Sequence, residues 1–294
     1  MNLQTFDLQF FTANVIASYL IETAAGPILI ETGPDTVFEN LESQINASGY
    51  SVDEVRHVFV THIHLDHAGS AWRFAERGAT IYVHPAGAKH LEDPSKLLAS
   101  AERIYGDEMD RLWGKVQPIP HERIRITDDK ESIAIGSARI QVLATPGHAS
   151  HHNAYLFQDA VFTGDVGGIR IDNGPVFPPT PPPDINIELW QESIRNIRNL
   201  NPAILYPTHF GASTTVTEHL DELENRLLEW TAFVGERVDA GKDDATITAE
   251  FKEMVESVYT MHSFSESTKK ASELADPHWM NVLGLVRYWK KYRM

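Results

Sequence analysis

One stretch constrains this chain more than any other, because four potential metal ligands directly follow an apolar run. Residues 55–61 read VRHVFVT, which is the pattern of a buried strand, and residues 62–67 read HIHLDH. A strand that ends near Thr61 sends the first two histidines to the same side as the chain turns. The aspartate and the third histidine then lie at the entrance of a helix. We expect all four side chains to converge on one spot.

Three later strands are predicted to end in the same way. The apolar runs that lead into TPGH, FTGD and YPTH each end with a potential ligand, namely His148, Asp165 and His209. Open sheets place ligand sites just past the carboxyl ends of their strands. These three side chains are therefore candidates to complete the group that begins at His62.

The chemistry of the candidates indicates metal binding. Five histidines and two aspartates match the needs of two borderline divalent ions, with zinc as the first expectation and iron or manganese as alternatives. The sequence contains no cysteine, which removes thiolate sites and cysteine nucleophiles. With two ions close together, a carboxylate can bridge them and a shared water loses its proton near neutral pH.

The rest of the chain alternates β-rich and helical patterns. The pattern predicts a hairpin around residues 24–26, strands at 79–84 and 203–211 and across 119–164, and helices at 35–49, 68–78, 185–200 and 215–240. It also predicts an irregular Gly- and Pro-rich loop at 167–184, and a helical segment at 244–294 with a break near 263–275. Two β-rich blocks, each followed by helices, favour an α/β fold, a four-layer αββα sandwich with a helical C-terminal extension. We expect a core over residues 1–214, followed by its last helix and the extension over residues 215–294.

The ordered motifs THIHLDHAG, TPGH, TGD and PTHFG resemble the metallo-β-lactamase fold superfamily of hydrolases over residues 14–211. The resemblance implies that Asp165 bridges two ions, one held by His62, His64 and His148 and the other by Asp66, His67 and His209. It also implies a catalytic reaction in which a hydroxide bridging the ions attacks a carbonyl carbon. Asp66 would orient that hydroxide or accept its proton.

The resemblance also indicates the chemical class of the substrate. The segment TPGHASHH is similar to glyoxalase II and related thioesterases, and N-acyl homoserine lactonases share the seven ligand types. The expected activity is therefore hydrolysis of a small thioester, ester or lactone. His151, His152 and His84 are further candidates, either as pocket residues or as hydrogen-bonding support for the ligands.

Net charge and hydropathy bear on the alternative functions and on the location of the protein. The chain has 25 Lys and Arg against 41 Asp and Glu, a formal net charge of -16, which disfavours nucleic-acid binding and hence a nuclease. An iron-dependent, dioxygenase-like oxidoreductase on the same fold is the other alternative. No run approaches the length of a membrane span, and we expect a cytoplasmic protein that acts on a small molecule and forms a homo-oligomer if it associates at all.

Overall fold

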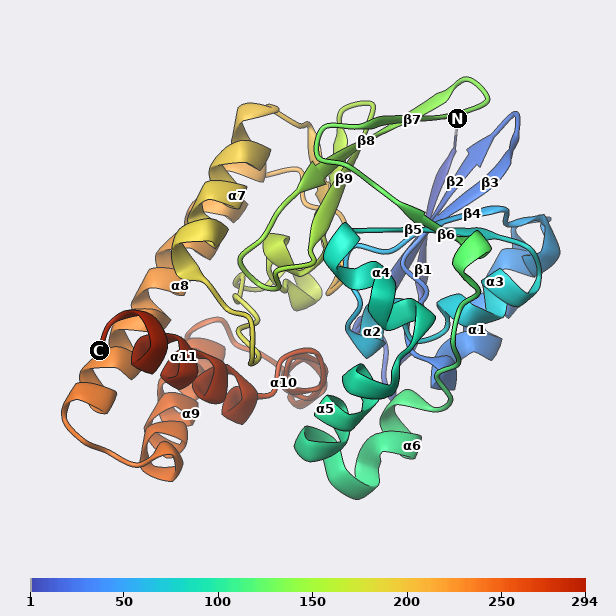
Figure 1. Ribbon diagram of the computed structural model, residues 1–294. Coiled ribbons are helices and arrows are strands. Elements are labelled where there is room, and N and C mark those ends of the chain that lie inside the picture. The colour runs from blue at the N-terminus through green and yellow to red at the C-terminus, as the bar shows by residue number, and fades with distance from the viewer. Residues whose placement is uncertain (1) are drawn as a thin grey trace. The chain divides into compact units, whose positions relative to one another are not determined.

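The computed structural model describes residues 2–294 and divides into two compact units (Figure 1). The first unit contains the chain up to residue 144 together with residues 151–158, and the second contains residues 145–150 and 159–294. None of the helices among the described residues combines the length and the apolar character needed to cross a membrane. The expected division of the chain at residue 214 stays a prediction.

A six-stranded sheet forms the centre of the first unit. Its strands lie in chain order, namely β1 (Leu3–Asp7), β2 (Ala17–Thr23), β3 (Gly26–Ile30), β4 (His57–Phe59), β5 (Thr80–Val83) and β6 (Ile124–Ile126). The strands β1 to β3 pair antiparallel, which confirms the predicted hairpin, and β3 to β6 pair in parallel. Parallel pairing brings the carboxyl ends of β3 and β4 to the same edge.

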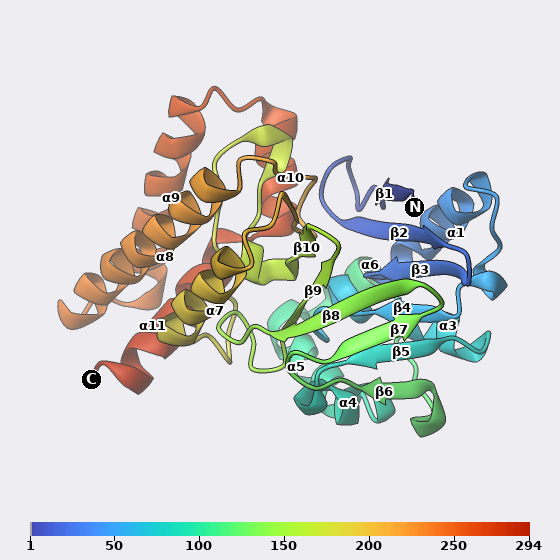
Figure 2. The ribbon, with the colours of Figure 1, turned by 90° about the horizontal axis from the view of Figure 1, so that it is seen from above.

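Both faces of this sheet are covered within the first unit (Figure 2). On one face, Phe38 of α1 (Phe38–Ala47) contacts Phe74 of α3 (Ala71–Glu76), with ring centroids 5.7 Å apart. On the other, the ring of Tyr155 lies 5.2 Å from that of Phe59, and its hydroxyl donates to the Val60 carbonyl at 2.7 Å. Burial on both faces explains why β3, β4 and β5 are mostly apolar, whereas β6 at the edge of the sheet is largely exposed.

The remaining elements of the first unit include an antiparallel meander and several short helices. They are β7 (Ser132–Ile135), β8 (Ala138–Ala144), β9 (Asn153–Phe157), α2 (Leu65–Ala68), α4 (Pro85–Glu92), α5 (Ser95–Tyr105), α6 (Met109–Trp113), η1 (Asp35–Val37), η2 (Val52–Glu54), η3 (Gly106–Glu108) and η4 (His121–Arg123). The single helix predicted at 68–78 is wrong in its start, because α2 and α3 are separate helices. Between them the backbone amide of Ser70 donates to the Gly33 carbonyl at 2.9 Å rather than to a carbonyl of α2.

The second unit joins a parallel strand pair to helices. Its elements are β10 (Ala160–Phe162), β11 (Ile204–Tyr206), η5 (Gly164–Gly167), η6 (Ile171–Asn173), α7 (Ile187–Asn199), α8 (Val216–Asp239), α9 (Asp244–Met261), α10 (Glu266–Ala275) and α11 (His278–Tyr292). The helices α8, α9 and α11 pack together, as the orange and red ribbons of Figure 1 show. The ring centroids of Trp230 and Phe251 lie 4.7 Å apart inside this packing.

One boundary in this region differs from the sequence prediction. Most of the segment predicted as a break, 263–275, is the helix α10. Ser265 caps it by accepting a hydrogen bond from the Thr268 amide at 3.1 Å. The chain leaves the helical conformation before Ser265 and again at Pro277, so there are two short breaks rather than one long one. The predicted irregular loop at 167–184 is confirmed, and η6 is its only helical turn after Gly167, the last residue of η5.

Candidate metal centre

The turn after β4 gathers the four predicted ligands of the first unit. The helix α2 begins at Leu65, so Asp66 and His67 lie in its single turn, just after His62 and His64. His62 and His67 are fully buried, with ring centroids 4.0 Å apart. His62 Nε2 lies 2.9 Å from His64 Nδ1, and His67 Nε2 lies 3.4 Å from Asp66 Oδ2. The four side chains therefore lie together as expected, and their role as ligands stays a prediction.

The sequence analysis missed a buried carboxylate, Glu31, that lies beside the Nδ1 atom of His67. Glu31 follows β3 and places Oε2 3.3 Å from His67 Nδ1, while its Oε1 accepts the Thr61 amide at 3.1 Å. A carboxylate on the far nitrogen of an imidazole fixes the ring and raises its basicity as a ligand. The signal was available, because Glu31 is a lone acidic residue at the end of an apolar strand that neighbours β4 in parallel.

The two adjacent histidines of the TPGHASHH segment lie beside the turn after β4. The ring centroid of His152 is 5.0 Å from that of His62, and His152 is fully buried. The ring centroid of His151 is 5.6 Å from that of His64. Both positions agree with the expected supporting or pocket role, which stays a prediction.

His84 has a local structural role. Its Nδ1 accepts the Ala86 amide at 3.1 Å, so the ring caps the first turn of α4. Burial lowers the pKa of His84, which favours the neutral ring that can accept this bond. The capping bond accounts for His84 without a catalytic role, and the expected site role stays a prediction.

Three predicted ligands come together in the second unit, each just past the end of a strand. His148 follows β8, Asp165 lies in η5 after β10, and His209 follows β11. Asp165 Oδ2 lies 3.3 Å from His148 Nε2, and Asp165 Oδ1 lies 3.5 Å from His209 Nε2. All three residues are buried. One carboxylate thus turns one oxygen toward each imidazole, which is the arrangement expected of a bridging ligand.

Neighbouring helices hold the two turns that carry His148 and Asp165. A Cβ on Gly147 would lie 2.4 Å from Trp190 of α7, and the Trp190 indole donates to the Val166 carbonyl at 2.9 Å. His219 of α8 donates from Nε2 to the Gly167 carbonyl at 2.7 Å. Sequence analysis assigns His219 no role, because a single histidine in a helix carries no motif.

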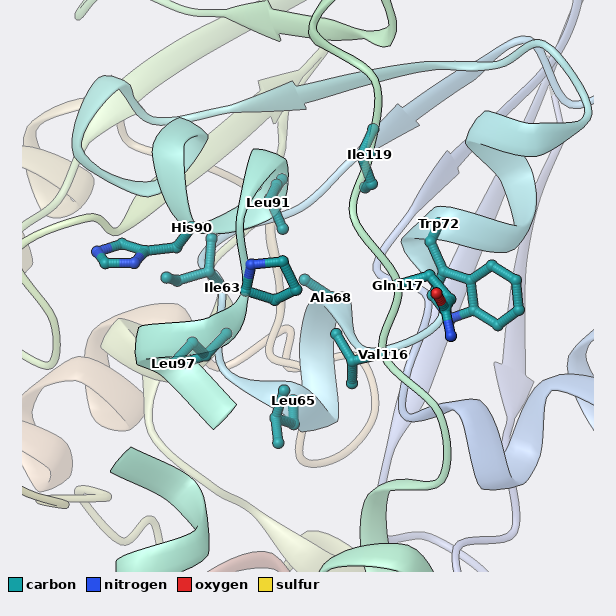
Figure 3. Close-up of a pocket in the computed structure, with 11 residues that line it drawn as sticks. Ile63, Leu65, Ala68, Trp72, His90, Leu91, Leu97, Val116, Gln117 and Ile119 are labelled. Atoms are coloured by element: carbon teal, nitrogen blue, oxygen red, sulfur yellow. The ribbon is translucent and has the colours of Figure 1, made fainter. Parts of the chain in front are cut away.

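A small apolar pocket adjoins the turn after β4 inside the first unit (Figure 3). Ile63 and Leu65, which alternate with the predicted ligands, form part of its wall. The other lining residues come from α2 to α5 and from the segment that follows α6: Ala68, Trp72, His90, Leu91, Pro94, Leu97, Val116, Gln117 and Ile119. Nearby, burial and the negative charge of Asp66 raise the pKa of the Tyr105 hydroxyl, which keeps that hydroxyl protonated.

The donor chemistry of these residues fits divalent metal ions. Both sets combine imidazole nitrogens with carboxylate oxygens, and the sequence offers no thiolate. Histidine and aspartate groups drawn from the seven predicted ligands could hold a metal ion. Zinc, iron and manganese all accept such ligands.

Comparison with known protein families gives a match across most of the chain. A family model described as the metallo-beta-lactamase superfamily matches residues 12–209. That span contains all seven predicted ligands and both units contribute to it.

Curated relatives match at low identity. A metallo-beta-lactamase fold-containing protein of Sulfurisphaera tokodaii is 30% identical over 178 residues, covering 58% of this chain and 67% of that protein. A hydroxyacylglutathione hydrolase of Shewanella halifaxensis is 27% identical over 164 residues, covering 56% of this chain and 51% of that protein. The matches thus span between about half and two thirds of the relatives' length, and include the glyoxalase II-like kind that the motifs predict.

Solved structures show the same fold. A metallo-beta-lactamase family protein from Thermus thermophilus matches with a TM-score of 0.74 and 18% identity, covering 98% of this chain and 93% of that chain. At this identity the likeness shows the fold alone, and it includes the C-terminal helices. The predicted fold class, an αββα sandwich with a helical C-terminal region, is confirmed.

Proposed function

Since this chain belongs to the metallo-β-lactamase superfamily, we propose that it is a metal-dependent hydrolase of small thioesters, esters or lactones. The observation that carries the proposal is the grouping of the seven predicted ligands just past the ends of strands, with one group in each unit. Five of the seven side chains are buried, and those of His64 and Asp66 are partly exposed. A relative named as a hydroxyacylglutathione hydrolase supports an acyl group as the substrate's reactive part.

The proposed centre uses all seven predicted ligands. One ion would be held by His62, His64 and His148, the other by Asp66, His67 and His209, with Asp165 bridging the two. The two oxygens of Asp165, each turned toward a different imidazole, support the bridging role. When bound, two such ions supply a Lewis acid for a carbonyl oxygen and lower the pKa of a water molecule.

The chain's own residues would orient the reacting groups. The Pro179 carbonyl accepts a hydrogen bond from His148 Nδ1, and Glu31 Oε2 lies 3.3 Å from His67 Nδ1, so each ring would present Nε2 as its ligand atom. Asp66 is the more accessible carboxylate of the two ligand sets, because its side chain is 22% exposed whereas that of Asp165 is 6% exposed. Asp66 would therefore orient the attacking water or accept its proton.

The apolar pocket beside Ile63 and Leu65 has room for little more than one water molecule, so it supports contact with a small apolar group of the substrate at most. Its wall is almost entirely aliphatic or aromatic, with His90 and Gln117 as the polar exceptions. Contact with an apolar wall does not determine which leaving group the substrate carries. The proposal therefore covers S-acyl thioesters, simple esters and lactones of small acids.

The test is hydrolysis by purified, zinc-loaded protein of one S-acylglutathione, one acyl ester and one N-acyl homoserine lactone. We expect turnover of at least one of them, and a loss of about a hundredfold or more in both His62→Ala and Asp66→Ala. His121→Ala is the matched control, because the His121 side chain is 84% exposed and remote in sequence from every ligand.

Two outcomes would contradict the proposal. Full turnover in both ligand variants would exclude a metal-dependent reaction at these residues. Oxygen consumption with iron-loaded protein, in the absence of hydrolysis, would favour the dioxygenase-like alternative instead.

A further inference from the structure

A buried asparagine in the C-terminal helix contacts the loop that holds one of the predicted ligands. Asn281 of α11 is 0% exposed, and its Oδ1 accepts the backbone amide of Thr180 at 2.6 Å. The same oxygen accepts the Thr180 hydroxyl at 2.9 Å. Thr180 is also fully buried, so these two donors depend on Asn281 rather than on solvent. The contact joins residues 101 positions apart in the chain.

The loop position held in this way lies next to His148. The carbonyl of Pro179, the residue before Thr180, accepts a hydrogen bond from His148 Nδ1 at 2.9 Å. A carbonyl can only accept, so the bond requires the proton on Nδ1 and leaves the Nε2 lone pair toward Asp165. The position of one backbone carbonyl therefore selects the ring tautomer that a metal ligand needs.

The backbone of α11 packs directly against this loop. A Cβ on Gly284, three residues after Asn281, would lie 1.8 Å from the Thr180 carbonyl oxygen. No side chain can fit there, so the helix backbone and the loop backbone are in contact. Asn281 and Gly284 thus fix the loop at Thr180, one by hydrogen bonds and the other by close approach.

We propose that Asn281 is a positioning residue for the metal centre and acts through Thr180 and Pro179 on the imidazole of His148. The C-terminal helices would then set the metal affinity of the core rather than only covering it. The inference rests on the proposed function in one respect, namely that His148 is a metal ligand. Its geometric part rests only on the contacts that join Asn281, Thr180, Pro179 and His148.

The test compares three variants in two measurements. Asn281→Ala removes the Oδ1 acceptor shared by both Thr180 donors and leaves the hydroxyl only the Asn281 main-chain carbonyl at 3.3 Å. Thr180→Val removes the hydroxyl donor but keeps the amide and the side-chain shape. Thr268→Val is the matched control, because the Thr268 hydroxyl donates to Asp172 Oδ2 at 2.8 Å and so attaches the same C-terminal region to η6 instead. Zinc affinity is measured by chelator competition, and the His148 tautomer by long-range 1H–15N NMR of the metal-free protein.

We expect Asn281→Ala to weaken zinc binding by about tenfold or more and to shift His148 from the Nδ1–H form toward a mixture of tautomers. Thr180→Val should show the same changes to a smaller extent, and Thr268→Val should leave both measurements at the wild-type values. If Asn281→Ala fails to fold, Thr180→Val alone decides, with Thr180→Ser expected to restore the wild-type values.

The inference is overturned if Asn281→Ala and Thr180→Val keep the wild-type affinity and tautomer, or if Thr268→Val changes them equally. Failure of the proposed function looks different. A wild-type protein that binds zinc as expected but hydrolyses no acyl substrate leaves the positioning role intact. A wild-type protein that binds no zinc refutes the metal centre, while the metal-free NMR measurement still decides whether Asn281 controls the His148 ring.

Discussion

Glu31 is a buried residue that contacts the predicted ligand His67 and belongs to no ligand motif. It lies at the end of β3, fully buried, with one oxygen toward His67 Nδ1 and the other on the Thr61 amide. Replacement by glutamine keeps the shape but removes the negative charge that orients the ring. We expect Glu31→Gln to weaken zinc binding by about tenfold, measured by competition with a chelator.

The same substitution at a surface carboxylate gives the control for Glu31. Glu22 accepts a hydrogen bond from the Gln4 side chain at 2.7 Å but has no contact with the predicted ligands among the interactions described. Glu22→Gln should bind zinc as the wild type does. Equal affinities in wild type and Glu31→Gln would show that the buried carboxylate does not tune His67.

His219 makes stability depend on pH in a defined window. Burial, aided by the charge of Arg170, lowers the pKa of His219 from 6.5 to about 4, despite the bond to the Gly167 carbonyl. As the pH falls below 6.5 the unfolded chain takes up this proton before the folded protein does, so the free energy of unfolding falls between pH 6.5 and 4. His219→Gln can keep a donor toward Gly167 and does not titrate.

Urea unfolding of the metal-free protein at pH 7.5 and pH 5 tests this dependence. The wild type should lose about 2 kcal/mol more stability than His219→Gln between these two pH values. All other titrating groups are shared by the two proteins and cancel in the comparison. Parallel losses in both would mean that His219 is protonated in the folded state at pH 5.

Among the elements of the second unit, α11 contacts the loop at Thr180 through its backbone as well as through its side chains. Gly284 leaves no room for a Cβ against the Thr180 carbonyl, so Gly284→Ala must displace the helix or the loop. Overpacking of this kind costs about 1–3 kcal/mol, and we expect a loss in that range in urea unfolding. Leu283→Ala, at an exposed position of the same helix, should change stability by about 0.5 kcal/mol or less. A Gly284→Ala protein as stable as Leu283→Ala would contradict the close approach.

At the scale of the whole molecule, metal binding should add to the stability of the fold. Both units contribute predicted ligands, and a ligand that binds only the folded chain stabilises it by mass action. At zinc concentrations about 100 times the dissociation constant the gain is about 2.7 kcal/mol. We therefore expect a chelator to lower the midpoint temperature of unfolding and added zinc to restore it. Circular dichroism measures this midpoint.

His62→Ala provides the control for that measurement, because it removes a fully buried predicted ligand. Its thermal midpoint should respond less to zinc than that of the wild type. A wild-type midpoint that does not change with zinc or chelator would argue against a metal centre assembled by folding.

The sequence alone was sufficient to locate the candidate ligands and the family. Each candidate ligand follows an apolar strand, and strand ends are local features that the alternation of residue types reveals. For the same reason the hairpin around residues 24–26 and the irregular loop at 167–184 agree with the structure. The start of α3 and the helix α10 were less predictable, because α3 begins where the Ser70 amide bonds the distant Gly33 carbonyl and α10 begins at the Ser265 cap.

Only the tertiary structure identified the residues that contact the candidate ligands or the turns that carry them. Glu31, His219 and Asn281 belong to no ligand motif, and each acts on a segment far away in the chain, on His67, Gly167 and Thr180 respectively. A motif records which atoms can bind a metal, since that depends on residue type and local spacing. Which neighbour orients those atoms depends on how distant strands and helices pack, and that information exists only in the folded chain.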